Sequence, residues 1–493
     1  MVLWKQAGFQ SDADRRTGPG RQNAPVPFFI GIPGNGAFDC EEVSGGDDML
    51  LIIHAKILTM TGDPIEEGYV VIDPPLIRDV GAGDPPDAWL ADPTCQVVDA
   101  GGGWLLPGLI DAHCHIGLFD DGLTLEGDDG NEGTDPVTPH LQAIDGIYHE
   151  DRCFSEALAA GVTSVMTGPG SANVIGGRFA LLHTAGRTVE EMAIRRLAAM
   201  KAALGENPKK HYGRKERSPS TRMGSAALLR ESLAQAVHYR DEKKRLDLQN
   251  KQTKLAPQGP DIISGGDRAA IVPQTAVQTP DARKEALQAV LDGSMILKIH
   301  AHRADDILTA VRIADEFGLR YTLEHCTEGY RIVDVLAKVY RAGRAEGFGC
   351  GIPGQGRLEG VITGPLLSDR SKPELVHADI RNPAILSAAG IPVAIMTDHP
   401  VIPEQYLAVS AAVACREGMD EMLALAAITR TAASLVGAGD LIGTIESGKQ
   451  ADLVLFSGHP FDFKTQIWRV WLDGHPASHK RAEPGDAPFD HDK

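Results

Sequence analysis

Two histidines separated by one residue close an apolar stretch of the chain. His113 and His115 end the sequence WLLPGLIDAHCH, which starts at residue 104. Side chains alternate between the two faces of a strand, so both imidazoles point the same way and Cys114 points away. Neutral imidazoles at the end of a buried strand are typical metal ligands, and the alternative is a pair of hydrogen-bonded core residues.

Three further polar residues each end an apolar strand pattern, namely His300, His325 and Asp398. In a parallel α/β barrel the carboxyl ends of the strands converge on the active site. Imidazole and carboxylate groups suit zinc or a similar divalent ion. We therefore expect these side chains to join the first two histidines in one metal site.

The elements that must position these side chains alternate between strand and helix patterns over residues 107–439. A strand pattern at 296–300, for example, is followed by a helix pattern at 305–317 and a strand pattern at 320–325. This alternation predicts a parallel α/β fold, and a (β/α)8 TIM barrel is its commonest closed form.

Residues 49–106 and 440–480 share a different texture, with short strand patterns divided by turns. We therefore predict one small β domain assembled from both ends of the chain. Residues 1–48 are rich in Gly, Pro, Asp and Arg without periodicity, and we expect a disordered tail. Since the first strand pattern opens at Met49, a natural start at that residue is a further hypothesis.

Residues 207–290 interrupt the alternation with a basic stretch and a helix pattern over 225–245. A solvated insertion is one interpretation, and a lid or oligomer contact over the barrel mouth is the other.

Composition excludes several classes of partner. The formal charge is −19, from 48 basic and 67 acidic residues, which argues against nucleic acid and anionic membranes. The seven cysteines follow no ligand or disulfide spacing, and we find neither a signal-peptide pattern nor an apolar run of membrane-spanning length. We expect a cytoplasmic homo-oligomer that acts on a small molecule.

Several motifs together resemble the amidohydrolase superfamily. PGLIDAHCH at residues 107–115 is similar to its first metal strand, and KIHAH at 298–302 resembles the fifth strand of the imidazolonepropionase-related branch. LEHC at 323–326 and MTDHP at 396–400 resemble the sixth and eighth strands, and residues 442–454 resemble the return to the β domain. The resemblance implies a (β/α)8 barrel beside a small β-sandwich.

The resemblance also implies roles for the candidate metal ligands. His113 and His115 would hold the more buried ion. His300 and His325 would hold a second ion, or His300 would join the first site if only one ion binds. Asp398 would contact the metal, take a proton from the attacking water and pass it to the leaving nitrogen, because a divalent ion makes bound water acidic near neutral pH.

The ligand that bridges two ions has two candidates in the sequence MKAALGENP at residues 200–208. Members of the superfamily with two ions often use a carbamylated lysine, and Lys201 fits that position. Others use a glutamate nearby, here Glu206. On a regular strand the two residues face opposite sides, so we favour Lys201, and the third possibility is that neither is a ligand.

Two residues are candidates for contact with the substrate. Arg178 ends a glycine-rich segment that follows a strand, so it could pair with a substrate carboxylate or be a surface arginine after a tight turn. His302 lies on the face of His300, one step outward, where it could stabilise a developing oxyanion.

We predict a metal-dependent hydrolase of the C–N bond in an amide, cyclic amide or peptide-like substrate. A deaminase of the same superfamily is the first alternative, although its usual glutamate is replaced here by Arg303. Imidazolone ring opening is disfavoured because the corresponding glutamate is replaced by His302. A non-catalytic scaffold is the second alternative, but such a protein would not need all the histidines and Asp398.

Overall fold

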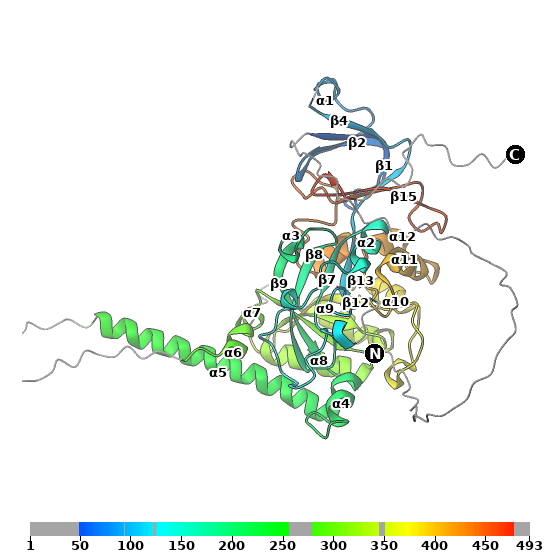
Figure 1. Cartoon of the computed structure of the whole chain (residues 1–493). Coiled ribbons are helices and arrows are strands. Elements are labelled where there is room, and N and C mark those ends of the chain that lie inside the picture. Colours follow the sequence, from blue (N-terminus) through cyan, green and yellow to red (C-terminus); the bar gives the residue numbers. More distant parts are fainter. Residues whose placement is uncertain (1–48, 93, 122–124, 256–278, 345–350, 478–493) are drawn as a thin grey trace, which may run out of the picture. The chain divides into compact units, whose positions relative to one another are not determined.

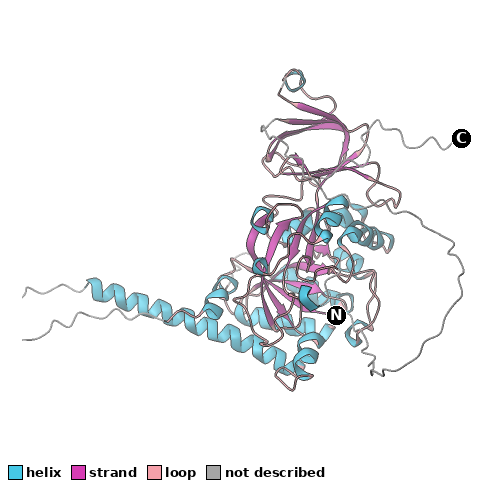
Figure 2. Cartoon of the chain, viewed as in Figure 1, coloured by secondary structure: helices cyan, strands magenta, loops and turns pink. Residues whose placement is uncertain are grey.

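The computed structural model describes residues 49–477 apart from residues 93, 122–124, 256–278 and 345–350. The predicted disordered tail, residues 1–48, lies outside this part of the chain. The described strands form two separate hydrogen-bonded sheets. Figure 2 shows that helices surround the strands of one sheet, while the other sheet has few helices beside it.

The first sheet takes its strands from both ends of the described chain (Figure 1). Its order is β16-β15-β14-β5-β1-β2-β3, and β4 pairs with β1. The antiparallel pairing of β14 with β5 joins the two chain ends. The sandwich form of this domain stays a prediction. The strands are β1 (Leu50–Ile57), β2 (Ile65–Asp73), β3 (Leu76–Ala82), β4 (Gln96–Asp99), β5 (Trp104–Pro107), β14 (Leu453–Phe456), β15 (Ile467–Leu472) and β16 (His475–Pro476).

The second sheet has eight strands, β6 to β13, paired in sequence order and nearly closed into a barrel. Several of them are buried along their whole length, as expected for strands covered on both faces. They are β6 (Leu109–Cys114), β7 (Val162–Thr167), β8 (Ile175–His183), β9 (Ala193–Ala203), β10 (Ile296–Ala301), β11 (Arg320–His325), β12 (Arg357–Thr363) and β13 (Val393–Ile395).

The barrel differs from the predicted all-parallel (β/α)8 arrangement at β8, which runs antiparallel to both β7 and β9. Only residues 168–174 separate β7 from β8, and the short helix α3 (Val189–Met192) lies between β8 and β9. A parallel crossover needs a dozen or more residues, whereas antiparallel neighbours tolerate short connections. The short loops therefore explain the reversed strand, and this part of the prediction is wrong.

The predicted helices of the barrel are present. Helix α2 begins after Asp151, whose carboxylate accepts a hydrogen bond from the Cys153 N–H, and α8 ends at Gly318 with φ of 64°. The remaining described α-helices are numbered in chain order. They are α1 (Asp87–Leu90), α2 (Arg152–Ala159), α4 (Glu206–Gly213), α5 (Arg222–Leu255), α6 (Ala282–Ala286), α7 (Gln288–Leu291), α8 (Ala304–Phe317), α9 (Val333–Ala342), α10 (Asn382–Ala388), α11 (Leu407–Arg416), α12 (Glu421–Ala426) and α13 (Arg430–Leu435).

Helix α5 is the helix predicted in the basic insertion, and it extends beyond the predicted bounds. Its first half packs on the barrel: Leu229 and Leu233 are fully buried, and Arg230 forms an ion pair of 2.6 Å with Glu316 of α8. The sequence 256–278 that follows lies outside the described residues. Among the helices that are described, none is both long enough and apolar enough to span a membrane.

A buried ion triad links β8 to the first sheet. His183 Nε2 at the end of β8 lies 3.1 Å from Asp452 Oδ2, and His183 Nδ1 lies 3.9 Å from Asp473 Oδ2. Burial opposes a charge on the ring, but the two carboxylates outweigh it and raise the pKa of His183. Because β8 is reversed, its last residue lies where it can meet the segment before β14.

Replacing His183 by Gln should lower the free energy of unfolding by about 3 kcal/mol at pH 6, because two carboxylates then lose their cation. The raised pKa gives the sign of the pH dependence. The stabilisation is complete below the ordinary histidine pKa of about 6.5 and is lost as the pH rises through the folded-state value. Urea denaturation from pH 6 to 9 should therefore show a narrowing gap between the two proteins.

The exposed His238 provides a matched control, and its replacement by Gln should change stability little at any pH in this range. A gap for His183→Gln that stays constant or widens with pH would contradict a charged ring in this triad.

Candidate active site

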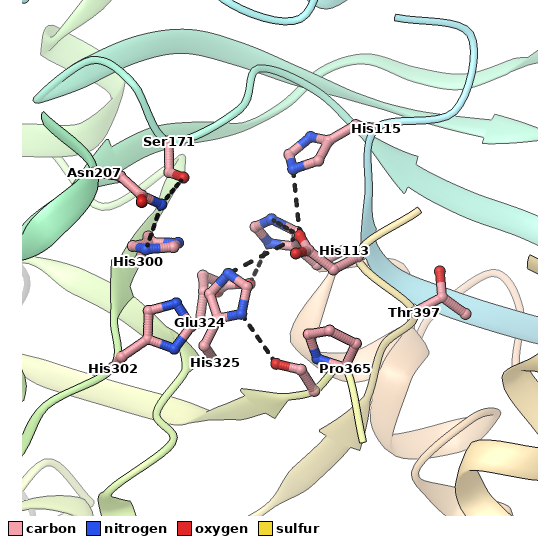
Figure 3. A network of polar contacts seen from close by, with 12 residues as sticks. His113, His115, Ser171, Asn207, His300, His302, Glu324, His325, Pro365 and Thr397 are labelled. Carbon is pink, nitrogen blue, oxygen red and sulfur yellow. Dashed lines mark hydrogen bonds and ion pairs between the residues drawn. The ribbon is translucent and has the colours of Figure 1, made fainter. Parts of the chain in front are cut away.

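The histidines that the sequence singled out converge inside the barrel (Figure 3). His113 lies in β6 and His115 directly after it, with ring centroids 5.3 Å apart. His300 of β10 and His325 of β11 have ring centroids 4.3 Å apart, and the His113 and His325 centroids are 5.8 Å apart. All four side chains are at least nine-tenths buried.

In three of these histidines an oxygen atom contacts Nδ1 and leaves Nε2 available. His113 Nδ1 lies 2.6 Å from Glu324 Oε2, and His115 Nδ1 lies 2.6 Å from the Gly168 carbonyl oxygen. His325 Nδ1 lies 3.0 Å from the Gly364 carbonyl oxygen. Since these oxygens accept a hydrogen bond from Nδ1–H, the Nε2 lone pairs are directed elsewhere, as in histidines that bind metals.

Asp398 is the carboxylate on which these nitrogens converge. Its Oδ1 lies 3.3 Å from His115 Nε2 and 3.9 Å from Nε2 of both His113 and His325. Burial opposes ionisation, but His325, His115 and Lys201 hold the pKa of Asp398 well below its usual range. Asp398 also has φ of 56°, a strained conformation that is common at functional sites.

Lys201 meets this group from β9. It is fully buried, its Nζ lies 3.0 Å from His113 Nε2, and burial lowers its pKa to about 8. A low pKa favours the neutral amine, which is the form that reacts as a nucleophile. Glu206, the other bridging candidate, opens α4 instead. Its carboxylate contacts Lys210 Nζ at 3.3 Å and accepts a 3.3 Å hydrogen bond from Glu374 N–H, so the structure does not bring it to the histidines.

The structure places Arg178 away from this cluster. It lies within β8 and pairs with Met200, whereas Gly177 pairs with Lys201. Adjacent residues of a strand face opposite sides, so Arg178 faces away from the side that carries Lys201. Its guanidinium donates to the His140 carbonyl oxygen at 2.9 Å. The glycine-rich segment before it does not end in a mouth loop, because β8 begins at Ile175.

His302 does join the cluster, with ring centroids 4.7 Å from His300 and 4.4 Å from His325. Its Nδ1 lies 2.7 Å from Thr327 Oγ1, and its Nε2 faces Glu374 Oε1 at 3.6 Å. Burial raises the pKa of Glu374 to about 7. Sequence reasoning did not identify Glu374, which follows β12 in a loop without a recognisable motif.

Two charged residues of the barrel interior also escaped sequence reasoning. Lys298 Nζ lies 2.9 Å from Glu324 Oε2, the same oxygen that contacts His113, and both side chains are almost fully buried. A signal was present, because Lys298 and Glu324 are charged residues within otherwise apolar strands. Such residues are rarely buried without a partner.

Asp111 couples the first strand of the barrel to the last. Its carboxylate accepts hydrogen bonds from the His113 N–H at 2.9 Å, the Thr397 N–H at 2.8 Å and the Thr397 hydroxyl at 2.6 Å. The His115 N–H donates to the His399 carbonyl oxygen at 3.0 Å. These bonds hold the segment around Asp398 against the two histidines of β6.

The donor set fits divalent metal ions. Ligand atoms of His113, His115 and Asp398 lie within 4.8 Å of one another, as do those of His300, His302 and His325. Burial lowers the pKa of His325 to about 4, and burial with neighbouring positive groups holds those of His113 and His300 well below the ordinary value. Neutral imidazole is the form that binds a metal. His300 Nδ1 is buried and has no hydrogen-bond partner among the described residues.

Comparison with known proteins identifies the family. A model of the amidohydrolase family matches residues 260–477. An amidohydrolase of known structure from Thermotoga maritima MSB8 is 38% identical, with a TM-score of 0.75, and the match covers 87% of this chain and 100% of that chain. The chain belongs to the amidohydrolase family. It is therefore a hydrolase that acts on carbon–nitrogen bonds, and the predicted superfamily is confirmed, while the imidazolonepropionase-related branch stays a prediction.

Curated relatives are similar over parts of their length. Amidohydrolase tasK of Hapsidospora irregularis is 26% identical over 393 residues, which are 77% of this chain and 37% of that protein. A 5-methylthioadenosine/S-adenosylhomocysteine deaminase of Bacillus cereus (strain AH820) is 34% identical over 79 residues, 14% of this chain and 18% of that protein. This chain thus spans well under half of the length of either relative.

Replacing Lys201 by Ala should remove about one metal ion per chain, because the side chain beside His113 Nε2 is then lost. Glu206→Ala is the matched control, since its carboxylate contacts Lys210 and the Glu374 N–H and should leave the metal content unchanged. Both variants should be prepared with zinc and bicarbonate, and metal content measured by mass spectrometry. If Glu206→Ala loses the ion and Lys201→Ala retains it, the assignment of Lys201 is wrong.

Proposed function

We propose that this amidohydrolase is metal-dependent and hydrolyses an amide, cyclic amide or peptide-like bond, with Asp398 as the general base and acid. The observation that carries the proposal is the position of Asp398 Oδ1, within 3.9 Å of three histidine Nε2 atoms. A carboxylate held among converging neutral imidazoles is suited both to contact a metal and to receive a proton.

His113 and His115 would hold one ion with Asp398, and His300 and His325 would hold a second. A bound divalent ion, in our proposal zinc, would lower the pKa of a coordinated water and polarise the substrate carbonyl. We propose a carbamylated Lys201 as the bridging group. Its buried position beside His113 and its pKa of about 8 support this role.

The chain's own residues would then perform the proton transfers. Asp398 would accept the proton of the attacking water at Oδ1 and deliver it to the leaving nitrogen, so that an amine and a carboxylate are released. Its depressed pKa keeps it ionised before the reaction. His302, on the substrate side of His300, would donate a hydrogen bond to the oxygen that gains charge.

A deaminase of the same family is the alternative that one comparison favours, namely the 34% identity to a deaminase over 79 residues. Against it, Arg303 occupies the place of the usual glutamate and forms a bidentate pair with Asp305 at 3.0 and 2.9 Å. Release of ammonia from amino-substituted heterocycles would support the deaminase, and release of an amine or of a ring-opened acid from small amides would support the proposal.

Replacing Asp398 by Asn should lower turnover about 100- to 10,000-fold, because Asn keeps the shape of the side chain but cannot accept the proton. The rate should be measured on the best substrate of a panel of amides, cyclic amides and dipeptides. Metal content and thermal unfolding are measured on the same sample. A variant that retains its metal and turns over within a few-fold of the parent would exclude Asp398 as the base.

A further inference from the structure

Asn207 links His300 to the loop after β7. The amide nitrogen Nδ2 of Asn207 lies 3.3 Å from His300 Nε2 and 2.7 Å from Ser171 Oγ, so one end of the amide contacts both groups (Figure 3). These contacts engage the ring nitrogen that His300 turns toward α4. The other nitrogen, Nδ1, is the buried atom without a hydrogen-bond partner among the described residues.

The two ends of a side-chain amide have nearly the same shape, so the hydrogen-bond network decides which end is the oxygen. If the end that contacts His300 is the NH2 group, Nε2 must accept and the ring hydrogen must sit on Nδ1, where no described residue accepts it. If that end is the oxygen, it accepts from His300 Nε2–H and from the Ser171 hydroxyl. The Nδ1 lone pair is then free.

The other histidines of the site support the second arrangement. In His113, His115 and His325, the ring nitrogen with an outer partner contacts an oxygen, and the opposite nitrogen is left with its lone pair. An Asn207 oxygen at His300 Nε2 gives His300 the same pattern with the two nitrogens exchanged. A metal ligand needs such a lone pair, and an acceptor behind the ring orients it.

We propose that Asn207 is a positioning residue that presents its amide oxygen to His300 Nε2–H, with Ser171 as the second donor, and thereby directs the His300 Nδ1 lone pair at a metal ion. The inference rests on the proposed metal-dependent function and adds to it the residue that sets the orientation of one ligand.

The surrounding backbone holds Asn207 in this place. The Leu204 N–H donates to the His300 carbonyl oxygen at 3.0 Å, which ties the end of β9 to β10. Glu206 and Glu374 exchange hydrogen bonds, since the Glu206 N–H donates to Glu374 Oε2 at 3.0 Å and the Glu374 N–H donates to a Glu206 carboxylate oxygen. The start of α4 is thus fixed on both sides of Asn207.

The test measures zinc and cobalt binding to the chelator-treated full chain in bicarbonate, with His300→Ala identifying the binding step that depends on His300. Asn207→Leu should weaken that step about 10- to 100-fold, because it removes the oxygen behind the ring. Asn207→Asp should bind within a few-fold of the parent, because a carboxylate oxygen accepts from Nε2–H. Exposed Lys209 of the same helix provides the control Lys209→Ala, which should bind like the parent.

Each outcome discriminates. Parental affinity in Asn207→Leu would overturn the proposal, and an equal loss in Asn207→Leu and Asn207→Asp would show that the amide acts as a donor. If Asn207→Leu fails to fold by thermal unfolding, Ser171→Ala replaces it and should also weaken the step, whereas unchanged binding would count against the arrangement. If the parent chain binds no ion at all, the proposed function fails, and that result is separate from any difference among variants.

Discussion

Charged groups in the interior of the barrel must compensate one another, and the rest of the site depends on this constraint. Lys201, Lys298 and Glu324 are almost fully buried among four apolar strands. Glu324 contacts both Lys298 and His113, so one carboxylate neutralises a lysine and fixes the orientation of a ligand. Removing one partner of a buried pair costs about 3–5 kcal/mol, which makes these residues interdependent.

The same arrangement connects stability with chemistry. Asp111 accepts three hydrogen bonds across the gap between β6 and β13 and so holds the Asp398 segment beside the histidines. On the other side, α4 fixes Asn207 behind His300 and positions Glu374 near His302. Rigid strands and their hydrogen-bonded partners therefore hold the reactive groups, which is the condition for catalysis by preorganised groups.

Local pattern predicted most of the metal ligands, because a histidine or aspartate at the end of an apolar strand is visible within a few residues. The partners of these ligands could not be predicted in this way. Glu324 contacts His113 across 211 positions of sequence, and no local pattern pairs them. The direction of β8 was also hidden, because strand periodicity is the same in both directions, and the predicted place of Arg178 at the mouth depended on that direction.

The most direct test of the central claim is a crystal structure of the zinc-loaded protein with anomalous diffraction measured at the zinc absorption edge. We predict a strong anomalous peak among His113, His115 and Asp398, with a second peak beside His300 and His325 if two ions bind. Absence of any peak at these histidines, or a peak confined to the buried triad of His183, Asp452 and Asp473, would contradict the account.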